Sequence, residues 1–155
     1  MATTISNHSL QFLVTLLVLN FFVNLSLVDG QGDPKSSPQY MKANAALKEC
    51  LLNLESTTAS MAKLPKTPAM QDCSEVLGDG VDKIRKSIGE MDTIQSSDFS
   101  FKTNNIQTWV SSALTGLTTC SDGLPNDPTK TQVQTVSKKT SNALALINDF
   151  AKVQK

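Results

Sequence analysis

The chain has 155 residues, and its 14 basic and 14 acidic side chains give a formal net charge of zero at pH 7. The chain has no stripe of basic residues with interleaved aromatic residues, so its charge pattern excludes the class of proteins that bind nucleic acid electrostatically. Aromatic residues make up only 5% of the sequence, and a core of small aliphatic side chains favours closely packed helices over a β-sandwich.

The first thirty residues are predicted to be a secretory signal peptide. Residues 10–28 form an uncharged apolar run, LQFLVTLLVLNFFVNLSLV, and Val28 and Gly30 are small residues at the −3 and −1 positions of a cleavage site. The basic n-region is weak, so an uncleaved membrane anchor is the alternative, because such a run could just span a thin bilayer. Cleavage would release residues 31–155 to the cell exterior as one domain, free of the membrane.

Four helices are predicted after a loose polar leader at residues 31–37, and together they form a bundle domain over 38–155. Three begin with a capping residue followed by proline, at Ser37-Pro38, Thr67-Pro68 and Asp127-Pro128. Apolar side chains recur every three or four residues over 38–64, 68–92, 104–122 and 128–150, the pattern of helices with one buried face. Pro65 and Gly123 are expected to end the first and third helices, and 93–103 to form a loop.

The short connections between these segments predict an all-α, up-down-up-down four-helix bundle. The second helix contains Gly78, Gly80 and Gly89, each of which costs about 1 kcal/mol relative to alanine in a helix interior. We expect close approach of a neighbouring helix to compensate for them.

The bundle arrangement also selects a disulfide. Cys73 near the start of the second helix and Cys120 near the end of the third are about equally far from the loop that joins these helices. In an antiparallel pair they should therefore lie side by side, and secretion would place them in an oxidising compartment. Cys50 is left over on the buried stripe of the first helix, where a packed free thiol is expected. A functional thiol or an intermolecular bridge is the alternative.

The residues needed for catalysis are missing from the expected mature chain. The single histidine, His8, would leave with the signal peptide, so no Ser–His or Cys–His pair and no imidazole zinc ligand remain. One unpaired cysteine cannot build a thiolate metal site, and Gly78-Asp79-Gly80 lies within a helix rather than in a phosphate-binding loop. We therefore expect neither an enzyme nor a cofactor or metal site.

An acidic stripe is the one polar pattern that suggests a binding surface. Glu75, Asp79 and Asp82 are spaced so that a helix places them on one face. The same spacing also allows ion pairs from Asp79 to Lys83 and from Asp82 to Lys86, which is typical of a solvated helix face. Pattern alone leaves both interpretations open.

Three segments together resemble the plant invertase and pectin methylesterase inhibitor family. They are DCSE at 72–75 followed by Asp79 and Asp82, WVSSALT at 109–115 followed by TCSDG at 119–123, and TSNALAL at 140–146. The resemblance runs from about Lys66 to Phe150 and is closest to the pectin methylesterase inhibitors. It implies a secreted four-helix bundle with a disulfide between the second and third helices, in agreement with the pattern of the residues.

The resemblance also implies a function and a set of contact residues. A family member would inhibit a cell-wall pectin methylesterase in the apoplast, bound one to one over its active-site cleft. Position by position, the partner-facing residues would be Glu75, Asp79 and Asp82 on the second helix and Thr119 and Asp122 at the end of the third. The alternative is that the inhibited enzyme is an acid invertase.

This sequence departs from the family at its beginning. Members usually start with a small helical hairpin closed by its own disulfide, whereas only QGDPKSSPQ precedes the first helix here. A shortened member without inhibitory activity is therefore a further alternative. An extracellular carrier of an apolar ligand and a scaffold dimer linked through Cys50 are the remaining alternatives, from other functional classes.

Overall fold

The computed structural model describes residues 11, 14–18 and 32–154, and the chain divides into two units, Met1–Gly32 and Asp33–Lys155. The second unit contains a 3-10 helix, η1 (Pro34–Ser36), and four long helices, α2 (Pro38–Met61), α3 (Pro68–Thr93), α4 (Phe99–Gly123) and α5 (Pro128–Phe150). The described residues contain no strand. The predicted all-α bundle is thus confirmed.

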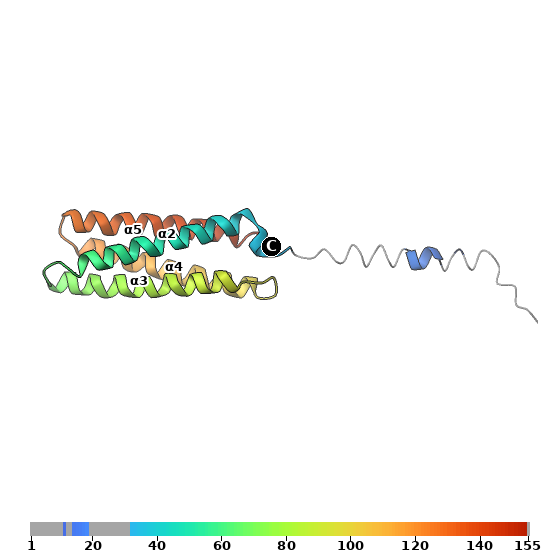
Figure 1. The fold of residues 1–155 in the computed structure, drawn as a ribbon, viewed down its shortest axis with the longest axis horizontal. Helices are drawn as coiled ribbons and strands as arrows, with labels where there is room; N and C mark the ends of the chain where they lie inside the picture. The colour runs from blue at the N-terminus through green and yellow to red at the C-terminus, as the bar shows by residue number, and fades with distance from the viewer. Residues whose placement is uncertain (1–10, 12–13, 19–31, 155) are drawn as a thin grey trace, which may run out of the picture. The chain divides into compact units, whose positions relative to one another are not determined.

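The four long helices form a closed ring in which each packs against two others. Helix α2 contacts α3 and α5, and α4 contacts the same two helices from the opposite side. Short connections at alternate ends give the up-down-up-down order (Figure 1). None of the helices within the described ranges has the length and apolar character of a membrane span. The predicted signal peptide and its cleavage site lie mostly outside the described residues.

Side-chain caps fix the starts of three helices, as the sequence predicts. The Ser37 hydroxyl accepts from the Tyr40 amide at 3.1 Å, and the Thr67 hydroxyl accepts from the Met70 amide at 3.3 Å. Asp127 accepts from the two amides of the first turn of α5. Each cap satisfies amides that have no partner within the helix, at a gain of about 1 kcal/mol.

Helix α4 begins at Phe99, so the prediction of a loop over 93–103 is wrong beyond residue 98. Phe99 is 3% exposed, and its ring lies edge-on to that of Phe150, with centroids 5.1 Å apart. Thr103, which is also buried, donates to the Phe99 carbonyl at 2.8 Å. Burial of Phe99 in the end of the core therefore favours an early start for the helix.

Two predicted helix ends also differ. Helix α2 ends at Met61 rather than Leu64, and Leu64 is 38% exposed in the connection to α3. Gly123 is the last residue of α4 instead of the residue after it, and no described residue has a positive φ. The extended residue after the helix is Leu124, whose side chain is 4% exposed. Burial of that leucine ends α4 without a left-handed glycine.

The described part of the leader is not loose. Asp33 caps η1, Pro34 is buried, and the Lys35 ammonium donates to the Asp92 carbonyl at the end of α3 at 2.6 Å. Lys102 donates to the neighbouring Thr93 carbonyl at 2.8 Å. Two cations thus satisfy carbonyls that the last turn of α3 leaves without intrahelical partners.

Among the described helix glycines, an approach too close for a Cβ occurs at one position, which was not predicted. A Cβ on Gly80 would be 3.5 Å from Leu54 Cδ2, which is ordinary van der Waals contact, whereas Gly78 and Gly89 face open space. The tight position is Gly116 on α4, where a Cβ would lie 2.9 Å from Val76 Cγ1 on α3. The expectation for Gly78 and Gly89 is therefore wrong.

Candidate protein-binding site

The predicted acidic stripe lies on the exposed outer face of α3. Glu75, Asp79 and Asp82 are all exposed. Asp79 pairs with Lys83 one turn away, as the spacing predicts. Asp82 instead lies 3.8 Å from the Arg85 guanidinium, and the predicted pair with Lys86 does not form. Exposed pairs of this kind contribute about 0–1 kcal/mol each, so they compete only weakly with a partner for the carboxylates.

Arg85 also takes part in a contact between two helices. The Arg85 guanidinium donates to the Glu55 carboxylate of α2 at 2.7 Å. Arg85 therefore points toward α2 and reaches Asp82 only loosely, at the side. This pair is not visible in the sequence, because it joins residues 30 positions apart.

The two predicted residues of α4 are also exposed, close to the disulfide that links α4 to α3. The Cys73–Cys120 disulfide forms as predicted, with the Cα atoms 4.8 Å apart. Thr119 and Glu75 lie within one turn of it, and Asp122 lies half a turn beyond Cys120. With a rise of about 1.5 Å per residue, Asp79 and Asp82 lie about 9 and 14 Å from Cys73 along the axis of α3.

Between these points the outer face of α4 carries no charge. The helix has no Asp, Glu, Lys or Arg from 103 to 121. Its exposed hydroxyls largely bond within the helix: Thr115 and Thr119 donate to carbonyls four residues earlier, each at 3.1 Å. A hydroxyl that already donates to a carbonyl of its own helix loses few hydrogen bonds when a partner displaces water from it. The charge-free run was visible in the sequence, but its position next to the acidic stripe depends on the pairing of α3 with α4.

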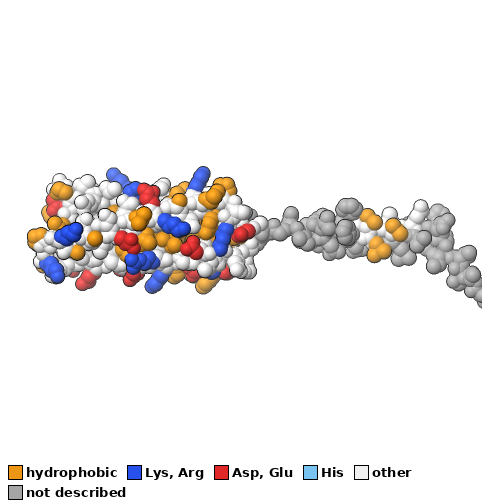
Figure 2. Space-filling view, viewed as in Figure 1, with side chains coloured by type: hydrophobic (Ala, Val, Ile, Leu, Met, Phe, Trp, Pro, Cys, Tyr) orange, Lys and Arg blue, Asp and Glu red, His pale blue; other side chains and the backbone are white. Residues whose placement is uncertain are grey.

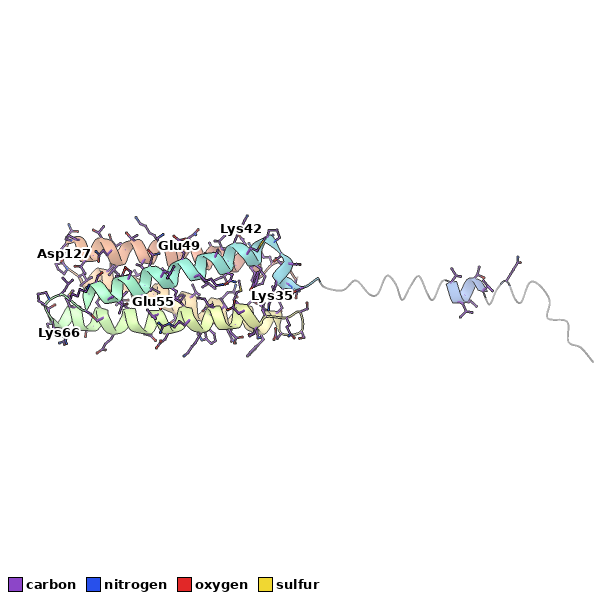
Figure 3. The ribbon with its side chains drawn as sticks, viewed as in Figure 1. Lys35, Lys42, Glu49, Glu55, Lys66 and Asp127 are labelled. Atoms are coloured by element: carbon purple, nitrogen blue, oxygen red, sulfur yellow. A yellow bond between two sulfur atoms is a disulfide. The ribbon has the colours of Figure 1, made fainter. Side chains whose placement is uncertain are left out.

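A groove lies at the same end of the bundle, where α2 connects to α3, and sequence analysis did not identify it. Its volume is about 310 Å³, and its lining includes the predicted contact residue Glu75. Figure 3 shows another lining residue, Lys66, at the same end as Asp127, with Lys35 and Lys42 at the opposite end. A larger groove of about 380 Å³ lies between α2 and α5 at that opposite end.

Unlike the outer face of α4, the face of the bundle that Figure 2 shows carries charges of both signs. Figure 2 shows basic and acidic side chains interspersed over α2, α3 and α5, without a large area of one sign in this view. Glu49 of α2 pairs with Lys139 of α5, and Glu55 pairs with Arg85 of α3. In contrast, the carboxylates of Glu75 and Asp122 make no hydrogen bond or ion pair with the residues that the structure describes.

Cys50 is the one free cysteine in the described chain, and its side chain is fully buried. Its sulfur lies 3.1 Å from the Thr140 hydroxyl, which donates its own proton to the Val136 carbonyl at 3.0 Å. The Cys50 thiol must therefore be the donor to Thr140. Burial raises the pKa of Cys50, so the reactive thiolate is disfavoured. The fold presents this thiol neither to a substrate nor to a second chain.

The predicted contact residues share one kind of polar chemistry. No group of three or more His, Cys, Asp or Glu side chains in the described ranges is placed to hold a metal ion. The five predicted contact residues offer carboxylate and hydroxyl oxygens on two helices that a disulfide joins. Such a surface can accept hydrogen bonds and pair with cations of a partner.

The chain is similar to a family of known plant proteins. The model of the family "Plant invertase/pectin methylesterase inhibitor" matches residues 24–146. Pectinesterase inhibitor 9 of Arabidopsis thaliana is 41% identical over 130 residues, which are 70% of this chain and 64% of that protein. The 21 kDa protein of Daucus carota is 35% identical over 136 residues, or 76% of this chain and 70% of its own length.

A solved structure supports the fold. The crystal structure of a pectin methylesterase inhibitor from Arabidopsis thaliana matches with a TM-score of 0.61 at 17% identity, over 73% of this chain and 79% of that one. The sequence relatives extend beyond the matched region, since this chain spans 64% and 70% of the two described above.

Proposed function

Because the chain belongs to the plant invertase/pectin methylesterase inhibitor family, we propose that it inhibits a pectin methylesterase outside the cell by binding one to one over the active-site cleft. The observation that carries the proposal is the set of exposed carboxylates on α3 and at the end of α4, held together by the Cys73–Cys120 disulfide. A relative named as a pectinesterase inhibitor, 41% identical, supports the choice of target.

The rigidity of the α3–α4 pair supports a binding role. Long helices joined by a disulfide hold their surface side chains in place before the partner arrives, so little conformational entropy is lost on binding. Glu75, Asp79 and Asp82 would face basic groups of the enzyme, with Thr119 and Asp122 as further contacts. The charge-free face of α4 would form the centre of the contact, where interfaces are usually poor in charge.

The carboxylates should not contribute equally to the proposed contact. Each would attract a basic group of the partner only where its charge is not already paired within this chain. Two carboxylates are paired within α3 and are only partly available. The unpaired carboxylates of Glu75 and Asp122 should therefore contribute most to the attraction.

The test is an enzyme assay with two targets. Pectin methylesterase and acid invertase are titrated separately with residues 31–155, refolded with the disulfide formed and shown to be helical. We expect saturable loss of esterase activity near one equivalent, with invertase unaffected. Loss of invertase activity alone would assign the protein to the other branch of the family. No effect on either enzyme would contradict the proposal.

A variant locates the binding face. Asp79→Ala is expected to raise the inhibitor concentration for half-inhibition by about three- to tenfold, as for loss of one interfacial charge contact. The thermal midpoint should change little, because the Asp79–Lys83 pair is exposed. The matched control is Asp149→Ala, which removes an exposed acid from an ion pair of the same kind on α5. If both variants raise the concentration for half-inhibition equally, the binding face cannot be assigned to α3.

A further inference from the structure

The groove where α2 connects to α3 is lined by both apolar and polar side chains and carries two opposite charges. Leu64, Pro65 and Met70 supply apolar surface, and Lys66 and Glu75 supply the charges. The remaining lining residues are Gln71, Ser74, Ala62 and the nearly buried Met61. The groove volume of about 310 Å³ is at the lower end of the range of about 300–1,000 Å³ for small-molecule sites. The groove thus suits one long side chain of a protein partner better than a large ligand.

The charge of Glu75 is uncompensated. Its carboxylate makes no ion pair or hydrogen bond with the described residues, although Lys66 lines the same groove. The larger groove at the opposite end differs, because its acid Asp149 is already paired with Lys152 at 2.8 Å. An unpaired carboxylate beside apolar surface therefore distinguishes the α2–α3 groove.

We propose that this groove holds a lysine or arginine side chain of the inhibited esterase, whose charged end pairs with Glu75. The inference rests on the proposed function and adds a specific contact to it. The aliphatic part of a lysine or arginine packs against apolar surface while its charged end stays at the rim. Methionine side chains adapt their shape to such an occupant.

The position of the groove links it to the predicted contact surface. Glu75 is two residues from Cys73, so the disulfide to α4 fixes this part of α3. Leu64 and Lys66 lie in the connection between helices, where the backbone runs outside regular secondary structure. A partner on the outer face of α3 could thus reach Glu75 and the groove together, and an acidic stripe matches a basic occupant in charge.

The first experiment compares two substitutions of equally exposed apolar residues. Leu64 is 38% exposed in the groove, and Val153 is 39% exposed at the other end of the bundle. Leu64→Lys removes apolar contact and repels a cation, so it should raise the concentration for half-inhibition of pectin methylesterase about tenfold or more. Val153→Lys should change it less than about twofold, as a substitution outside the interface.

The second experiment determines the charge of the occupant. Glu75→Gln should weaken inhibition about three- to tenfold, whereas Lys66→Met should strengthen it several-fold by removing a repulsive charge. An acidic occupant would reverse both signs and overturn the inference. Circular dichroism and urea unfolding of each variant exclude loss of folding as the cause.

The outcomes separate the two proposals. If the wild type inhibits the esterase and Leu64→Lys inhibits equally well, the groove is not a contact and the proposed function stands. If the wild type neither binds nor inhibits the esterase, both proposals fail. If Leu64→Lys weakens inhibition and Val153→Lys does not, with the expected opposite signs at Glu75 and Lys66, the groove holds a basic side chain of the enzyme.

Discussion

The contact between Gly116 and Val76 predicts that alanine at residue 116 destabilises the protein, although alanine is the better helix former. The added Cβ would be 2.9 Å from Val76 Cγ1, closer than two carbon atoms can approach without repulsion. Val76 is β-branched, and such a side chain strongly prefers one rotamer in a helix. Its methyl group cannot easily swing away, so α3 and α4 would have to separate.

Two opposing terms set the size of the effect. Replacing glycine by alanine inside a helix stabilises by about 1 kcal/mol. Overpacking a close contact destabilises by about 1–3 kcal/mol. We expect Gly116→Ala to lower the free energy of unfolding by about 0–2 kcal/mol, the difference between these two terms. In a Val76→Ala background the clash disappears, and Gly116→Ala should stabilise by about 1 kcal/mol.

The assay is a double-mutant cycle measured by urea unfolding of the wild type, the two single variants and the double variant. The coupling energy between residues 76 and 116 should equal the packing term, about 1–3 kcal/mol. Gly89→Ala is the matched control, because Gly89 lies in a helix and faces open space. If Gly116→Ala stabilises the wild type as much as Gly89→Ala does, the helices do not meet tightly at this point and the reasoning is refuted.

Three further predictions concern the cysteines and one carboxylate. The disulfide closes a loop of 47 residues, so replacing Cys73 and Cys120 by serine should lower the free energy of unfolding by about 4 kcal/mol according to the chain-entropy relation. Urea unfolding measures this loss, and a value below about 1 kcal/mol would contradict the prediction. Cys50 should react with a thiol reagent in the native protein only at the rate of unfolding, and fast native labelling would contradict its burial. The Gln95 amide, and then the Lys102 ammonium, lower the pKa of Asp98 from its ordinary value of 3.8. Asp98 therefore stabilises the fold above pH 3.8 and loses that contribution as the pH falls through its lowered pKa. The stability difference from Asp98→Asn, followed by urea unfolding, should shrink in that acidic range, and a constant difference would contradict it.

The starts of α2, α3 and α5 could be predicted because their signals are local. A serine, threonine or aspartate followed by proline caps the helix through its own side chain. The start of α4 lacks the proline, and the carboxylate of Asp98 accepts from Gln95 rather than from the first turn of its helix. What fixes this start is the packing of Phe99 against Phe150, 51 positions away in the chain. Sequence periodicity carries no information on such a contact.

The candidate site was predictable to a similar extent. A helical spacing suffices to place Glu75, Asp79 and Asp82 on one face, and the geometry of an antiparallel pair suffices for the disulfide. The partners of the charges are not set by spacing alone. Arg85 pairs with Glu55 of another helix, and Asp82 lies near Arg85 rather than Lys86. The groove was missed because its lining comes from the end of α2, the connection and the start of α3.

The same end of the bundle combines the features that give a binding surface a fixed shape. The disulfide joins α3 to α4, and Gly116, one turn away from Cys120, lets these helices approach closely at Val76. The carboxylates are left exposed on the outside of this pair, and two of them have no partner in the described residues. Rigidity here also favours binding, because a contact held in place loses less entropy when the partner docks. A change in the spacing of α3 and α4 should therefore weaken inhibition even where the bundle still folds.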